Sequence, residues 1–178
     1  MSLAPASRDA ESGAALALAM AGDAAHAQAI TEELNKNFPL NTLTQSVWLP
    51  TIRGQLEINR RVPSSAIELL QAAAPYELGH TNFGPSVYPI YIRGEAYLAA
   101  GQGAAAVAGF QKILDHRGLV QNCPTGALAH LGLARAYALQ KDTVKAKAAY
   151  QDFLTLWKDA DPDIPIYKQA KVEYAKLQ

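Results

Sequence analysis

The side chains that could perform catalysis or bind a metal are few and widely spaced in this sequence. The histidines belong to different predicted helices or loops, and none has a second metal ligand three or four residues away. They are His26, His80, His116 and His130. Cys123 lies in a connector with no base nearby in the sequence, so nothing there predicts an activated thiol. We expect surface or ordinary interior roles for these five residues.

Two short motifs resemble ligand-binding loops but lack a required feature. Asp159, Asp161 and Asp163 alternate as in a calcium loop, yet the turn glycine is missing and Ala170 stands where the closing glutamate would fall. We predict instead that these aspartates end one helix and cap the next. The Gly-Gln-Gly segment at 101–103 follows a helix rather than a strand, which predicts a turn and not a phosphate site. The sequence therefore predicts no catalytic residue, no metal site and no cofactor.

Composition narrows the class of protein further. The chain of 178 residues is 49% hydrophobic and 18% charged, which is typical of a folded domain. Its 16 basic and 16 acidic side chains give a formal net charge of zero. Neither nucleic acid nor a membrane surface is therefore an expected partner, and no apolar run approaches the ~20 residues of a membrane-spanning helix. The single cysteine excludes an internal disulfide.

Helical periodicity runs through most of the chain, because apolar residues recur every three or four positions and no long segment alternates with period two. We predict a disordered lead-in, or residues added by cloning, over 1–8 and a single all-α domain over 9–178. Pro50 lies inside one helical pattern, which predicts either a kink or a later helix start. The predicted units are four helix pairs over about 9–38, 42–75, 86–117 and 125–158, and a capping helix over 163–177.

The helix pairs repeat at an interval of 40 residues. A small residue lies midway along three successive first helices, at Gly54, Gly94 and Ala134. The second helices carry equivalent alanines, then large apolar residues, at Ala66, Ala106 and Ala146 and at Leu70, Phe110 and Tyr150. We expect each small residue to let a neighbouring helix approach closely while the large residues fill the space between pairs. One pair cannot bury its apolar face alone, so stacking of pairs supplies the core.

This pattern resembles the tetratricopeptide repeat (TPR) family over about residues 8–158. The family signature is a small residue, an aromatic, a turn glycine, an alanine and a second aromatic, which stand here as Gly94, Tyr97, Gly101, Ala106 and Phe110. The second pair departs most, with Glu57 at the aromatic position and Arg61 at the turn. The 40-residue interval exceeds the usual ~34 and matches HEAT-type repeats, but the signature favours TPR. The resemblance implies a right-handed TPR-type α-solenoid of four helix pairs plus a C-terminal capping helix.

A narrower resemblance concerns three segments, 66–77, 110–118 and 131–140. They look like the C-terminal TPR regions of bacterial eukaryotic-like serine/threonine protein kinases. The chain itself has no glycine-rich loop on a strand and no Asp-Phe-Gly motif. The resemblance therefore implies a non-catalytic part of a larger signalling protein, located in the cytoplasm or attached to a membrane-anchored full-length protein.

In TPR solenoids the first helix of each pair lines a concave groove that holds peptides or helices. Mapping that stripe onto this chain predicts nine partner-binding residues: Trp48, Thr51, Gln55, Tyr88, Tyr91, Glu95, Leu128, Leu131 and Arg135. Tryptophan, tyrosine and arginine dominate the energetics of many interfaces. The competing interpretation places Trp48 and the tyrosines in the core between pairs. The Lys/Asn/Arg clamp of chaperone-tail-binding TPR domains is absent from the stripe, so a peptide carboxyl terminus is not an expected ligand.

Arg53 and Arg93 occupy positions where the TPR family has an apolar residue, and lie ~200° around the helix from the stripe. We expect them to snorkel or to pair with carboxylates of an adjoining pair, which would create a polar site between pairs. Overall the sequence predicts a protein–protein interaction or regulatory module, not an enzyme, that binds a protein or peptide. The alternatives are self-association through Ala-rich faces, giving a homo-oligomer, and an enzyme with a site of paired ionisable groups between pairs.

Overall fold

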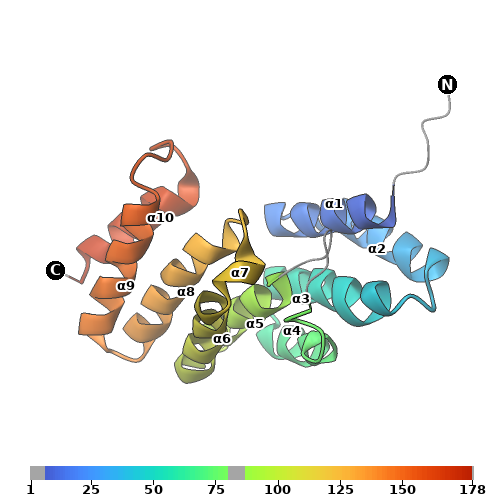
Figure 1. Ribbon diagram of the computed structural model, residues 1–178, viewed down its shortest axis with the longest axis horizontal. Coiled ribbons are helices and arrows are strands. Elements are labelled where there is room, and N and C mark those ends of the chain that lie inside the picture. Colours follow the sequence, from blue (N-terminus) through green and yellow to red (C-terminus); the bar gives the residue numbers. More distant parts are fainter. Residues whose placement is uncertain (1–6, 80–86, 178) are drawn as a thin grey trace.

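The structure, a computed structural model, describes residues 7–79 and 87–177 (Figure 1). Within these ranges all regular secondary structure is helical, as predicted, and no strand is present. Residues 1–6 of the predicted lead-in and residues 80–86, which include His80, lie outside the described residues. The helices are α1 (Arg8–Ala21), α2 (Ala24–Asn37), α3 (Leu49–Asn59), α4 (Pro63–Leu70), α5 (Tyr88–Ala99), α6 (Gly103–Asp115), α7 (Arg117–Val120), α8 (Thr125–Leu139), α9 (Thr143–Leu156) and α10 (Pro165–Ala175).

The helices pack in pairs that follow one another along the long axis of the molecule (Figure 1). The helices of four consecutive pairs, α1 with α2, α3 with α4, α5 with α6, and α8 with α9, pack extensively against each other, and α6 also packs extensively against α8 of the next pair. The first helices also contact one another in series, from α1 to α3, α5 and α8, and α10 packs against α9. Among the described helices, none has both the length and the apolar character needed to cross a membrane.

The turn within each pair has the same backbone conformation in all four pairs. The turn residues are Gly22, Arg61, Gly101 and Lys141, and each has a positive φ, between 63° and 87°. After each turn residue, the next backbone N–H reaches back across the turn to a carbonyl of the first helix, at 2.8–3.0 Å. This bond satisfies a carbonyl that the end of a helix would otherwise leave without a donor. Two of the four pairs reach this geometry without glycine, which explains why the sequence signature is weaker there.

Phe110 is the centre of the core between α5, α6 and α8. Its side chain is fully buried and lies against two glycines. A Cβ built on Gly94 would approach the Phe110 ring to 2.7 Å, and one built on Gly132 to 2.5 Å. The ring also meets Tyr91 edge-on, with centroids 6.0 Å apart. The predicted role of Gly94 in close helix approach is therefore confirmed, and Gly54 meets Leu70 in the same way, at 3.0 Å.

The helix around Pro50 starts with a wider turn. Residues Thr44–Trp48 form a π-helical turn that leads directly into α3, with the Leu49 N–H donating to the Thr44 carbonyl. Pro50 occupies the first turn of α3, where its missing N–H breaks no α-helical hydrogen bond. The α-helix thus starts at Leu49, later than the predicted start near residue 42, and a π turn precedes it.

Two local predictions are wrong. The segment between the predicted pairs 86–117 and 125–158 includes most of a short helix, α7, where no helix was predicted. The three alternating aspartates do not cap α10, whose N-cap is Ile164 with Pro165 at the first helical position. Asp161 instead accepts a hydrogen bond from the Asp163 backbone N–H at 2.8 Å, which tightens the loop. By contrast, Asp23 is the N-cap of α2 and accepts from the His26 N–H, at 3.3 Å.

Candidate functional site

The nine residues of the predicted binding stripe lie on three first helices and the π turn, and they differ in accessibility. Five are buried in the core: Trp48, Thr51, Tyr91, Leu128 and Leu131. Four remain partly accessible: Gln55, Tyr88, Glu95 and Arg135. The stripe therefore forms the inner layer between the first helices, and only the partly accessible members offer surface to a partner.

At its N-terminal end the stripe satisfies most of its polar groups internally. The Thr51 hydroxyl donates to the Val47 carbonyl at 2.6 Å, and the Gln55 amide donates to Asn59 at 2.9 Å. Trp48 is 4% exposed, and its indole N–H has no acceptor among the described residues. This end of the stripe contributes packing more than recognition.

At the C-terminal end, one stripe residue, Arg135, belongs to an ionic cluster that reaches α10. Arg135 donates two hydrogen bonds to the Glu173 carboxylate, from Nε at 2.9 Å and from an Nη atom at 3.2 Å. The Tyr150 hydroxyl donates to the same carboxylate at 3.0 Å, and Gln169 donates to it at 2.8 Å. Burial and the adjacent carboxylate raise the pKa of Tyr150, so its phenol stays protonated as a donor. Sequence reasoning missed Glu173, because no local signal predicts where a capping helix docks.

Glu95 lies beside this cluster without joining it. Among the described residues its carboxylate forms neither a hydrogen bond nor an ion pair. Burial raises the pKa of Glu95, an effect that the nearby Arg135 opposes and Glu173 reinforces. Burial, followed by the Glu95 charge, likewise raises the pKa of Tyr91. Two neighbouring carboxylates therefore differ: Glu173 accepts hydrogen bonds from several donors, and Glu95 accepts none from the described residues.

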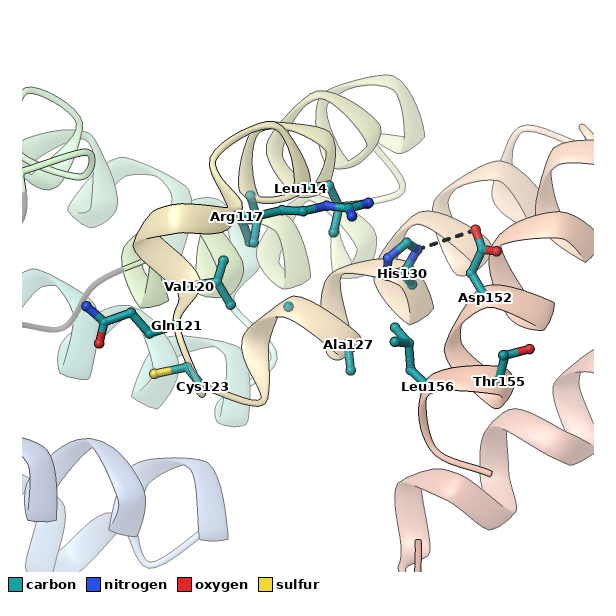
Figure 2. Close-up of a pocket in the computed structure, with 12 residues that line it drawn as sticks. Leu114, Arg117, Val120, Gln121, Cys123, Ala127, His130, Asp152, Thr155 and Leu156 are labelled. Atoms are coloured by element: carbon teal, nitrogen blue, oxygen red, sulfur yellow. Dashed lines mark ion pairs between the residues drawn. The ribbon is translucent and has the colours of Figure 1, made fainter. Parts of the chain in front are cut away.

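A cavity of about 540 Å³ opens between α6, α7, α8 and α9, away from the stripe (Figure 2). Apolar side chains form much of its lining, and Arg117, His130 and Asp152 are its charged or titratable groups. His130 Nδ1 lies 3.5 Å from an Asp152 carboxylate oxygen. Burial lowers the pKa of His130, which the neighbouring Asp152 partly counteracts. The sequence analysis placed His130 and Asp152 in the same helix pair but predicted no contact between them.

Cys123 lines the same cavity but does not approach His130. Figure 2 shows its sulfur pointing away from the imidazole, at the far end of the cavity. The arrangement therefore provides no base for the thiol, and a cysteine–histidine nucleophile is not formed. Among the described residues no group of three or more His, Cys, Asp or Glu side chains could hold a metal ion.

Arg53 and Arg93, which occupy equivalent positions in the sequence, have different surroundings. Arg93 pairs at 2.7 Å with Glu77, a carboxylate of the preceding pair that also accepts from Lys112 at 2.5 Å. This confirms the predicted pairing for Arg93. Arg53 lines a smaller cavity of about 230 Å³ between α2, α3 and α4 and has no ion-pair partner among the described residues.

Compared with known protein families, curated proteins and solved structures, the chain matches none of them.

Proposed function

We propose that this chain is a non-catalytic protein–protein interaction module, a TPR-type right-handed solenoid that binds a protein or peptide along its first helices. The observation that carries the proposal is the serial contact of α1, α3, α5 and α8. Because these helices are neighbours, their exposed side chains form one elongated surface. An elongated surface of this kind suits an extended peptide or a single helix.

The accessible part of this surface favours recognition of a polar segment. Tyr88 is half-buried and offers an aromatic face, while Glu95 and Arg135 add opposite charges beside it. Aromatic and arginine side chains of this kind often carry much of the energy of an interface. The buried stripe residues support the proposal indirectly, by fixing the spacing of the helices that present the accessible ones.

A peptide selection with structural mapping tests this function. Peptides selected from a random phage library against the purified chain are titrated into isotope-labelled protein and followed by NMR. We expect shifts concentrated at Gln55, Tyr88 and Glu95. If no peptide is selected, or if the shifts map to α2, α4, α6 and α9, the proposal is wrong.

Self-association is the second candidate, and an exposed small-residue face favours it. Ala104 and Ala108 on α6 and Ala148 on α9 are all exposed, and small side chains permit close contact between helices. Sedimentation velocity over a hundredfold concentration range measures this directly. A concentration-dependent dimer that Ala108→Glu abolishes would establish it, whereas a constant monomer would exclude it.

The wider context we propose is a larger signalling protein such as a bacterial serine/threonine kinase. This part of the proposal is supported only by the amino-acid sequences of segments 66–77, 110–118 and 131–140. The intact open reading frame tests it. A kinase domain in the same polypeptide would support it, and a reading frame without one would refute it.

A further inference from the structure

Glu95 is an acidic group on the proposed binding surface that the chain leaves without a partner. α5 presents Tyr88, Tyr91 and Glu95 on one side, because offsets of three and four residues return to the same face of a helix. Glu95 is partly buried, so water solvates its carboxylate less well than it would solvate a fully exposed one. A partly buried carboxylate without a donor destabilises its surroundings unless a positive charge reaches it.

The nearby Arg135 interacts with Glu95 electrostatically but gives its hydrogen bonds to another carboxylate. It directs Nε and one Nη atom to the two oxygens of Glu173, which is the fork geometry that guanidinium groups favour. One arginine therefore serves two carboxylates. When both carboxylates are ionised the three groups carry a net charge of −1, which favours an added cation beside Glu95.

Tyr88, on the same face of α5, suits the stem of a long cationic side chain. Its side chain is partly accessible, whereas Tyr91 is 6% exposed and packs edge-on against Phe110. A lysine or arginine side chain packs its methylene groups on aromatic rings and gains a cation–π contribution there. An acidic or apolar side chain would leave Glu95 unpaired and dehydrate it further.

We propose that the accessible surface of the first helices recognises a basic side chain, a lysine or arginine of the bound protein or peptide, which pairs with Glu95 beside the ring of Tyr88. The inference rests on the proposed function, because it specifies the chemistry of a ligand on the same surface. It adds that the ligand must be basic at the position that faces α5.

Parallel peptide selections test this specificity. A random decamer phage library is selected on the wild-type chain, on Glu95→Gln, and on the control variant Glu68→Gln. Glu68 is an exposed carboxylate on α4, so the control removes the same charge elsewhere. We expect lysine or arginine to be enriched at one position for the wild type and the control but not for Glu95→Gln. Thermal unfolding of each variant verifies that all three chains are folded.

A double-mutant cycle with one selected peptide then measures the contact. Replacing the enriched basic residue by glutamine, or Glu95 by glutamine, is expected to weaken binding about tenfold each. The two changes together should weaken it no further, because both remove the same ion pair. Peptides that bind the stripe without a basic residue, or additive effects in the cycle, would overturn this inference and leave the proposed function intact. A library that yields no peptide at all would overturn both.

Discussion

Two grooves lie between successive second helices, at equivalent positions of the repeat. One is filled by charged side chains, and the other contains a cavity. The closed groove, between α4 and α6, is filled by Glu77, which pairs with Arg93 on α5 and with Lys112 on α6. The open groove, between α6 and α9, contains the cavity of about 540 Å³. At the 40-residue interval, Arg117 is equivalent to Glu77 and Asp152 to Lys112, so the signs of both charges are reversed.

A third pair of equivalent residues, Arg93 and Leu133, explains why only one groove closes. The Glu77 side chain is 2% exposed, and a carboxylate buried to that extent needs more than one positive neighbour. Arg93 supplies the second cation from the floor of the closed groove, whereas the equivalent residue of the open groove is Leu133. Arg117 therefore stays exposed without an ion pair among the described residues, and Asp152 contacts His130 instead. We infer that an arginine in place of a leucine at this position determines whether a groove between pairs is filled by the chain or left hollow.

The largest expected effect comes from breaking the closed groove. Glu77→Gln leaves the buried Arg93 without its counter-charge, and we expect the free energy of unfolding to fall by about 3 kcal/mol. Urea denaturation measures this loss. Glu68→Gln, at an exposed site, should change the free energy by less than about 0.5 kcal/mol. Equal losses in the two variants would show that the ion cluster does not hold the groove closed.

The next effect concerns the packing of Gly132 on α8 against α6, the helix that borders both grooves. Gly132→Ala would place a methyl group 2.5 Å from the Phe110 ring, so the ring must move. Overpacking of this kind costs about 1–3 kcal/mol, partly offset by the higher helix propensity of alanine. A matched control is Gly13→Ala in α1, where a Cβ meets nothing within 4 Å and stability should rise by about 0.5 kcal/mol. Stabilisation by both substitutions, measured by thermal unfolding, would contradict the tight packing of Phe110.

These features differ in how far the sequence could predict them. The periodicity of Gly94 and Phe110 predicted their packing, because both lie at repeated positions. Gly132 was missed, because isoleucine occupies the equivalent position in both earlier pairs. Helical periodicity predicts which residues share a face of a helix. How deeply those residues are buried depends on how closely α3, α5 and α8 approach one another. That distance is a tertiary property, and so five stripe residues are buried although the pattern could not distinguish them from the accessible four.

The ion clusters were less predictable still. The sequence predicted that Arg93 would pair with a carboxylate, but it did not predict which one. The partner, Glu77, lies in a turn, and helical periodicity does not predict the course of a turn. Glu173 lies 38 residues from Arg135, and their contact depends on how α10 docks. Local sequence patterns predict helices and faces in this chain, whereas long-range charge contacts follow from the assembled structure.

A smaller effect is expected from transplanting the charges of the closed groove into the open one. Arg117→Glu combined with Asp152→Lys reproduces the signs of Glu77 and Lys112 but not Arg93. The Asp152 side chain is 62% exposed, so solvent screens the new pair, and stability should change by less than about 1 kcal/mol. If urea denaturation shows a gain of 2 kcal/mol or more, the floor arginine is not the deciding residue.

The smallest effect is the pH response of the open groove, which the closed groove lacks because it has no histidine at the position of His130. Burial lowers the pKa of His130 below its ordinary value of 6.5, Asp152 raises it and Arg117 lowers it. The folded chain therefore binds fewer protons than the unfolded chain at pH values just below 6.5. Stability contributed by neutral His130 is present above pH 6.5 and is lost as the pH falls through the lowered pKa.

Two variants test the contribution of each neighbouring charge. Asp152→Asn should lower the pKa of His130 further and enlarge the loss of stability, whereas Arg117→Gln should raise the pKa and reduce the loss. An NMR titration of the His130 ring measures both shifts, and movement of the two variants in the same direction would refute this electrostatic account of the open groove.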